Sequence, residues 1–146
     1  MIKFVRLDYR LLHGQVVFSW TGHVGAQRII VVDDDAANDE MKKSALLLSK
    51  PAGVRVNIFT VDKTIAKMPK VEQLDEKIMM IFGNTAALLK FCQAYPKIKE
   101  INYGAVANKP GSKIKTISIA NELAEAIYSV YTNQPVSTIF GGNLNL

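Results

Sequence analysis

Short apolar runs alternate along this chain with segments in which apolar residues recur every three or four positions. The clearest runs, Ile29–Val32 and Ile78–Phe82, are continuously apolar, which is typical of strands covered on both faces of a parallel sheet. We therefore predict strands at Ile2–Leu7, Arg28–Val32, Val54–Val61, Lys77–Phe82, Glu100–Tyr103 and Val136–Phe140.

Helical periodicity fills several of the segments between these runs. A helix-like run, Gln15–Val24, follows the first strand, and Asn38–Ser49 forms a second. The i, i+3/i+4, i+7 spacing of apolar residues predicts helices with one face toward a core. The predicted stripes are Met41, Ala45 and Leu48; Leu88, Phe91, Cys92 and Tyr95; and Leu123, Ile127, Val130 and Tyr131.

Turn and capping residues separate these elements. Asn38 and Thr85 are predicted helix N-caps, and Pro51, Gly53 and Pro69 mark element ends. Alternating strands and helices predict an α/β fold with a mostly parallel central sheet of about six strands. The length of 146 residues predicts a single domain spanning 1–146.

The composition indicates a soluble globular protein, with 49% hydrophobic and 21% charged residues. No apolar run approaches the roughly 20 residues that span a bilayer, and the N-terminus lacks the apolar segment of a secretory signal. The single cysteine, Cys92, cannot form an internal disulfide, which fits a reducing compartment. We expect a cytoplasmic protein.

The formal charge of +5 and pI of about 9.3 raise the question of nucleic-acid binding. The basic residues are scattered, and the densest clusters, Lys42–Lys43 and Lys109–Lys115, are not interleaved with aromatic residues. We therefore expect no nucleic-acid partner. The charge is instead suited to attracting an acidic protein or an anionic group.

Ligands of open parallel sheets bind beyond the carboxyl ends of the strands. His13, one of two histidines in the chain, lies in the first segment at that edge, immediately before a predicted helix. The segments expected there are Asp8–Gly14, Asp33–Ala37, Asp62–Thr64, Gly83–Thr85, Gly104–Ala107 and the residues after Phe140.

The stretch RLDYRLLHGQV, residues 6–16, combines groups suited to carrying a phosphate. A neutral imidazole is a nucleophile near pH 7, and an aspartate that holds one ring N–H leaves the other nitrogen free to attack. Arginines, a helix N-terminus and the close approach allowed by Gly14 would neutralise the phosphate. A structural interpretation, with His13 capping the helix and the arginines paired with acids, is equally compatible with these residues alone.

The acidic run Asp33–Asp35 offers a second function class. Carboxylates after a strand are ligands for Mg²⁺, as in a receiver domain phosphorylated on aspartate. We prefer a structural interpretation, in which the three acids lie at a helix N-terminus where the helix dipole favours negative charge. No phosphate-binding glycine motif of a nucleotide site occurs. His23, Cys92 and Trp20 are interpreted as ordinary helix or core residues.

The stretch from Arg6 to Val16 resembles the R-I-D-x-R-L-I-H-G-Q-V loop of the IIB component in the mannose/fructose/sorbose class of the bacterial phosphoenolpyruvate-dependent sugar phosphotransferase system. Ile30–Glu40, Pro51–Val54 and Ile98–Gly104 are also similar to that family, in the same order. The resemblance implies a three-layer α/β/α fold and a protein-phosphohistidine–sugar phosphotransferase. Its phosphoryl group would come from a IIA protein and pass to a sugar held by the membrane components IIC and IID.

Carried over residue by residue, the resemblance makes His13 the phosphorylated histidine, attacking through Nδ1. Asp8 and Arg10 would orient the ring and neutralise the phosphate, while Arg6 has a weaker claim because it belongs to the strand. The loop with Gly83 and Asn84 would close over the site. No metal and no cofactor are expected. The implied phosphate-binding residues are Arg6, Arg10, Gly14, Gln15, Gly83 and Asn84.

The sequence departs from the family pattern in three places. Gly83–Thr85 replaces a segment that usually carries Lys-Asn-Pro, and Gly104 is followed by Ala105 where the family has a second glycine. The last predicted strand runs into Gly141–Asn143 instead of an Arg-x-Val-Pro segment.

Overall fold

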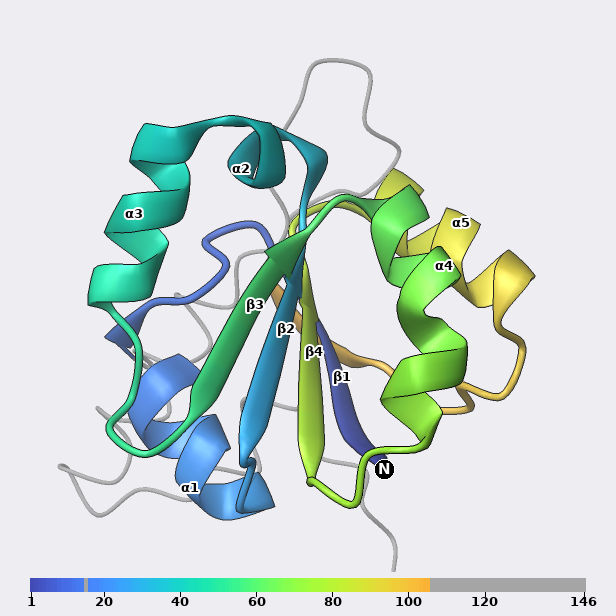
Figure 1. Cartoon of the computed structure of the whole chain (residues 1–146), viewed down its shortest axis with the longest axis horizontal. Coiled ribbons are helices and arrows are strands. Elements are labelled where there is room, and N and C mark those ends of the chain that lie inside the picture. Colours follow the sequence, from blue (N-terminus) through green and yellow to red (C-terminus); the bar gives the residue numbers. More distant parts are fainter. Residues whose placement is uncertain (15, 106–146) are drawn as a thin grey trace, which may run out of the picture. The chain divides into compact units, whose positions relative to one another are not determined.

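In the part of the chain that the structure describes, five parallel strands form one sheet (Figure 1). A computed structural model of the chain describes residues 1–14 and 16–105. The order across the sheet is β3-β2-β4-β1-β5, and each neighbouring pair is parallel. The strands are β1 Ile2–Asp8, β2 Arg28–Val32, β3 Arg55–Phe59, β4 Ile78–Phe82 and β5 Asn102–Ala105.

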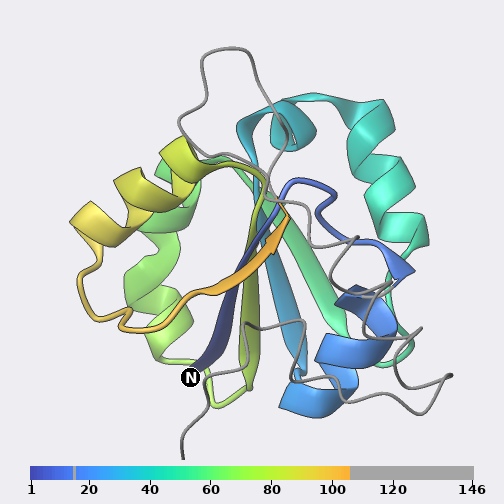
Figure 2. The same ribbon diagram turned by 180° about the vertical axis from the view of Figure 1, so that it is seen from behind.

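Helices cover both faces of the sheet (Figures 1 and 2). A π-helical turn, η1, leads directly into α1, and this segment lies with α2 and α3 on one side, whereas α4 and α5 lie on the other. The helical segments are η1 Val16–Trp20, α1 Thr21–Val24, α2 Asp34–Asn38, α3 Glu40–Leu48, α4 Val61–Glu72 and α5 Thr85–Ala94.

Two hydrophobic cores follow from the alternation of side chains along the strands. Val32 and Phe82 face α4 and α5, whereas their neighbours Val31 and Ile81 face η1 and the α2–α3 side. All four are fully buried, so β2 and β4 are apolar on both faces. This arrangement confirms the predicted three-layer α/β/α fold with a parallel sheet.

The predicted N-caps are each wrong by one residue. Asp39, not Asn38, accepts hydrogen bonds from the first turn of α3, and Asn84, not Thr85, accepts one from Ala87 N at 2.8 Å. An N-cap needs extended backbone, and both true caps have it. Asn38 is instead the last residue of α2, and Thr85 the first of α5.

The buried face of α3 is also not the predicted one. Met41 and Leu48 are 83% and 89% exposed, whereas Leu46 packs against the core on the α2–α3 side. Three consecutive leucines, Leu46–Leu48, make more than one stripe compatible with helical periodicity, so the sequence pattern did not identify the face.

Helix α4 occupies residues that the sequence pattern left unassigned. The strand predicted to reach Val61 ends at Phe59 because the Thr60 hydroxyl caps α4, accepting from Lys63 N at 3.2 Å. Pro69 lies inside the helix and not at its end. The stripe Val61, Thr64, Met68 and Val71 is buried, and this packing holds the helix despite the N–H that proline lacks.

The predicted sixth strand, Val136–Phe140, and the stripe from Leu123 to Tyr131 lie outside the described residues. The described residues belong to one compact unit, Met1–Asn108, and a single domain over 1–146 stays a prediction. Among the described helices, none has the length and apolar character needed to cross a membrane.

Candidate active site

The loop after β1 folds back over the end of its own strand. Tyr9 N donates to Ala105 O at 2.9 Å, and Leu11 N donates to Asp8 O at 3.0 Å, so β5 and a tight turn both hold the loop. Leu11 adopts a left-handed conformation with φ of 55°, which is unfavourable for a leucine and occurs where surrounding contacts impose it. The turn brings His13 back to Asp8.

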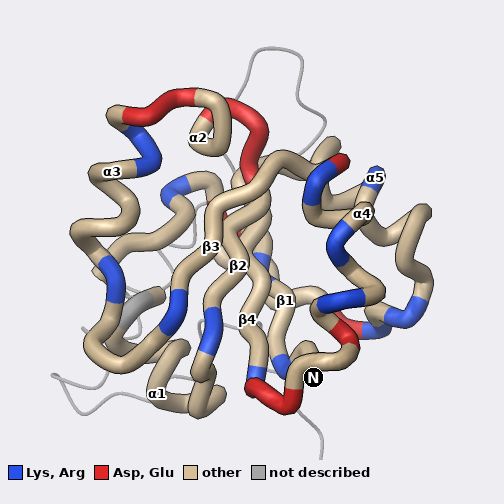
Figure 3. Tube along the Cα trace, viewed as in Figure 1, with Lys and Arg blue, Asp and Glu red and all other residues tan. Residues whose placement is uncertain are grey.

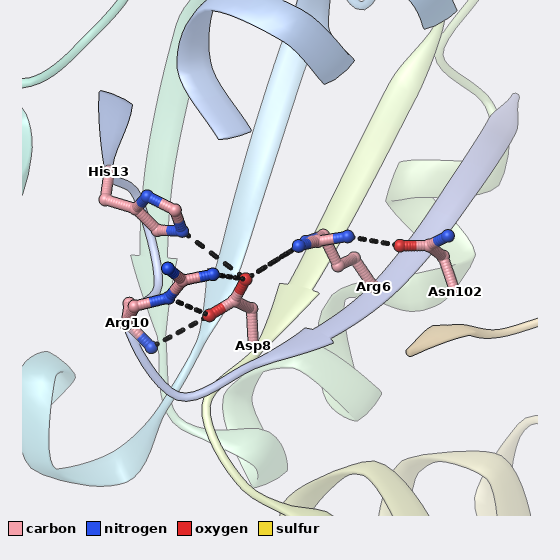
Figure 4. Close-up of polar contacts among 5 residues, drawn as sticks. All are labelled: Arg6, Asp8, Arg10, His13 and Asn102. Atoms are coloured by element: carbon pink, nitrogen blue, oxygen red, sulfur yellow. Dashed lines mark hydrogen bonds and ion pairs between the residues drawn. The ribbon is translucent and has the colours of Figure 1, made fainter. Parts of the chain in front are cut away.

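The carboxylate of Asp8 is fully buried and receives five arginine and backbone N–H groups (Figure 4). Arg6 donates Nε and Nη2 to Oδ2 at 3.2 and 2.8 Å. Arg10 donates Nη2 to Oδ2 at 3.1 Å, and its Nε and backbone N to Oδ1 at 3.0 and 3.2 Å. Burial raises the pKa of Asp8, but these hydrogen bonds, Arg10's first, outweigh it and lower the pKa to about 2. Asp8 is therefore ionised at neutral pH.

His13 directs one ring nitrogen at this carboxylate. Its Nε2 lies 3.4 Å from Oδ2 of Asp8, and Figure 4 shows Nδ1 on the side of the ring that faces away from it. The side chain is 22% exposed. An ionised carboxylate accepts a proton-bearing nitrogen, so the contact favours the tautomer with N–H at Nε2 and a lone pair on Nδ1.

The two arginines differ in their surroundings. The Arg6 side chain is 8% exposed, and Nη1 donates to Oδ1 of Asn102 on β5. Its guanidinium lies 5.4 Å from the ring of Trp20. The Arg10 side chain is 39% exposed. Arg6 is thus held inside the protein, while Arg10 borders solvent.

The remaining predicted site residues line the same edge of the sheet. Gly83 follows β4, and a Cβ atom there would meet Leu11 at 2.9 Å and overlap the carboxylate of Asp33. The side-chain amide oxygen of Asn84, Oδ1, caps α5 by accepting from Ala87 N, so part of the side chain's hydrogen-bonding capacity serves the fold. Apart from its chain neighbours and the backbone of its own helical turn, no described residue comes within 4 Å of a Cβ placed on Gly14, so the described part of the chain leaves the backbone beside His13 uncovered. Gln15 lies outside the described residues.

Two site residues were not identified from the sequence. Asn102 contacts Arg6, and a Cβ at Gly104 would lie 2.5 Å from the guanidinium carbon of Arg6 and 2.7 Å from Oδ2 of Asp8. Glycine at 104 therefore lets β5 approach the Arg6–Asp8 pair. The sequence showed only that Gly104 follows the expected strand Glu100–Tyr103, and it did not indicate which residues this glycine would contact.

The acidic run gathers at the start of α2, where Figure 3 shows it in red. Asp33 caps α2 by accepting from Ala36 N at 2.9 Å, and Asp34 accepts from Val61 N at 2.8 Å. Within the described part of the chain, no three His, Cys, Asp or Glu side chains form a group that could hold a metal ion. Asp33 is the N-cap of α2, and Asp34 and Asp35 lie in its first turn, which is the helix N-terminus preferred as the interpretation of this run.

The other histidine, the tryptophan and the cysteine have the ordinary roles expected of them. Trp20 stacks on Phe4 with ring centroids 4.8 Å apart, and the exposed His23 meets the edge of Trp20 at 5.9 Å. Cys92 packs beside the core that α4 and α5 cover, where burial raises the pKa of its thiol.

Comparison with known proteins places this geometry in a family. A family model described as the PTS system sorbose subfamily IIB component matches residues 2–135. The sorbose-specific EIIB component of Klebsiella pneumoniae is 34% identical over 119 residues, which are 82% of this chain and 73% of that protein. The mannose-specific EIIAB component of Escherichia coli is 33% identical over 111 residues, and the match spans 34% of its length.

Solved structures of IIB components resemble this chain as well. The IIB domain of the sorbose permease from Klebsiella pneumoniae superposes with a TM-score of 0.70 at 29% identity, covering 92% of this chain and 84% of that one. The N-acetylgalactosamine-specific IIB component 1 of Escherichia coli gives 0.70 at 27% identity, covering 92% and 90%. This chain belongs to the sorbose subfamily of IIB components of the sugar phosphotransferase system.

Proposed function

We propose that this protein is a cytoplasmic phosphocarrier in which Nδ1 of His13 accepts a phosphoryl group from a histidine of a IIA partner. The group then passes to a sugar during uptake through the membrane components IIC and IID. The observation that carries the proposal is the contact of His13 Nε2 with the buried, ionised Asp8. It supports Nδ1 as the free nucleophile.

In the first step the Nδ1 lone pair attacks phosphorus, and the P–N bond to the IIA histidine breaks. The electron pair of that bond returns to the IIA imidazole. The proton on Nε2 of His13 stays in place, and the positive charge that develops on the ring is stabilised by Asp8. In the second step a sugar hydroxyl attacks phosphorus, loses its proton to a base, and His13 leaves as a neutral imidazole.

Arg10 is the proposed partner of the phosphoryl oxygens. Its side chain is exposed enough to exchange a hydrogen bond to Asp8 for one to phosphate, and a guanidinium suits that geometry. Within residues 1–14 and 16–105, nothing beyond its own chain neighbours and helix backbone lies within 4 Å of a Cβ placed on Gly14, which supports a role for the Gly14–Gln15 backbone. Gly83 and Asn84 are proposed to close the site from the next loop. Arg6 ranks behind Arg10 because its donors face Asp8 and Asn102.

The proposed substrate class is a sugar, and no single sugar is assigned. The relatives are named for sorbose, mannose, N-acetylgalactosamine and fructose, and they match this chain at similar identities of 30–34%. In this proposal the sugar is bound by the membrane components.

A reconstituted relay tests the proposal. The full chain is mixed with the upstream carriers, phosphoenolpyruvate and membranes containing IIC and IID, and sugar phosphate is measured. We expect His13→Ala to abolish sugar phosphorylation and His23→Ala to retain a near-normal rate, since His23 lies on α1 against Trp20. Sugar phosphorylation by His13→Ala at the normal rate would contradict the proposal.

A further inference from the structure

Arg6 bridges two strands that are far apart in sequence. It extends from β1 with Nε and Nη2 on Oδ2 of Asp8, and with Nη1 on the side-chain oxygen of Asn102, 96 residues later on β5. Residues 6 and 102 are also direct partners in the register of the two strands. Asn102 thus fixes the end of the guanidinium that Asp8 does not hold.

The burial of Asp8 makes this bridge consequential. A buried carboxylate must be compensated by donors, and here the donors come from one buried and one partly exposed arginine. If Arg10 turns to a phosphoryl group, as in the proposed function, Asp8 loses one of these two side-chain partners. The Arg6 donors remain, because a phosphate at His13 does not require them.

Two further contacts restrict Arg6. Trp20 lies under its guanidinium and is itself stacked on Phe4. Gly104 lies so close to the same guanidinium that no Cβ would fit there without displacement. The observed arrangement of the guanidinium thus satisfies Asp8 and Asn102 while Trp20 and Gly104 pack against it.

We propose that Arg6, held by Asn102, is a positioning residue that keeps Asp8 charged and aimed at His13 Nε2 while Arg10 moves to the phosphoryl group. The movement of Arg10 to the phosphoryl group is the part of this proposal that rests on the proposed function. The other part is that Asn102 controls the His13 tautomer through Arg6 and Asp8. It applies to the unphosphorylated protein and is testable there.

The test compares Asn102→Ala with a matched control, Asn57→Ala. Asn57 on β3 accepts from Nη1 of Arg28, whose Nε is bound to Glu76, so the same Arg–Asn–carboxylate arrangement recurs outside the site. Nitrogen-15 NMR of the full chain at pH 8 measures the His13 tautomer. Trp20 fluorescence, from the only tryptophan in the sequence, reports displacement of Arg6.

We expect Asn102→Ala to convert a predominantly Nε2–H ring into a mixture of tautomers, to change Trp20 emission, and to slow phosphoryl transfer from IIA about tenfold. Asn102→Asp keeps the acceptor oxygen and should restore the tautomer. Asn57→Ala should change none of these readouts. If Asn102→Ala does not fold, Arg6→Lys, which keeps the charge without the planar fork, should give the same tautomer mixture.

An unchanged tautomer in folded Asn102→Ala and Arg6→Lys would overturn the proposal, even if His13 is phosphorylated normally. Equal tautomer changes in Asn57→Ala would also overturn it, since they would show a general effect of strand loosening. Failure of the proposed function is distinguishable, because it would appear as phosphorylation of another residue while the tautomer still depended on Asn102.

Discussion

The Nε2 atom of His13 lies 3.4 Å from Oδ2 of Asp8, while Nδ1 of the same ring faces away from that carboxylate (Figure 4). This relationship assigns different tasks to the two nitrogens. In the proposed function, Nε2 orients the ring and Nδ1 takes part in the chemistry.

Arg10→Ala should slow phosphoryl transfer from IIA far more than Arg6→Ala. Loss of a charge-assisted contact to the transferring group costs on the order of 2–4 kcal/mol, by analogy with loss of an oxyanion-hole donor, or roughly a hundredfold in rate. Arg6→Ala should slow transfer about tenfold, the scale expected for loss of an outer-shell partner. Arg10→Lys should recover only part of the loss.

Rapid-quench kinetics with phosphorylated IIA measures all three arginine variants. Arg6→Ala should also lower the free energy of unfolding by about 2 kcal/mol, since Asp8 loses a buried charged partner. Equal slowing by the two alanine variants, or none from Arg10→Ala, would show that the phosphate is bound elsewhere.

The ionisation of Asp8 predicts a pH-dependent contribution to stability. Its pKa falls from 3.8 to about 2 on folding, so its stabilising effect is complete above about pH 4 and is lost as pH falls toward 2. Between pH 5 and pH 2, the difference in unfolding free energy between wild type and Asp8→Asn should shrink by about 2 kcal/mol. Urea titrations across this range check it. A difference independent of pH would mean that Asp8 is not stabilised as a carboxylate.

Gly104→Ala should disturb the site without touching His13. The added methyl group would lie 2.5 Å from the Arg6 guanidinium carbon, and relieving such overlap costs about 1–3 kcal/mol of stability. The displacement should also alter the His13 tautomer. Gly22→Ala on α1 is the control, because no described residue other than its chain neighbours and its own helix backbone lies within 4 Å of its added Cβ. Gly104→Ala with wild-type stability and tautomer would contradict the close packing of β5 on Arg6.

Transfer from IIA to this protein should not require a divalent cation. Nucleotide-dependent transfer uses Mg²⁺ to bind the charged oxygens, whereas here Arg10 and backbone N–H groups are proposed to take that part. We expect EDTA, added after the upstream carriers are charged, to leave the transfer rate unchanged. If EDTA stops the transfer and Mg²⁺ restores it, the acidic run Asp33–Asp35 becomes the better candidate.

The parts of the fold that depend on local pattern were predictable. The bounds of β2 agree with the predicted strand Arg28–Val32, and β4 begins one residue later than the predicted Lys77–Phe82. The face of α3 was not predictable because Leu46–Leu48 satisfy several stripes, and only the position of the helix over the sheet selects Leu46. Helix α4 was missed because Pro69 is usually a helix terminator, and its buried stripe is visible only once the sheet supplies the other side.

The candidate site also contains residues that the local sequence predicts and residues that it does not. Asp8, Arg10 and His13 lie within six consecutive residues, and the resemblance of that loop to the family motif predicted that they meet. Asn102 and Gly104 reach the site through the pairing of β1 with β5. Which residue of a distant strand faces Arg6 is set by register, and register arises from the packing of the whole sheet.

The central claim is that Nδ1 of His13 carries the phosphoryl group, and phosphorus-31 NMR of the protein after charging by IIA tests it most directly. The account predicts one phosphohistidine signal, with the chemical shift of a phosphate on Nδ1, stable in alkali and lost in acid. The signal should be absent from His13→Ala and present in His23→Ala. A signal at the shift of an Nε2 phosphate, an alkali-labile acyl phosphate, or a full signal in His13→Ala would contradict the account.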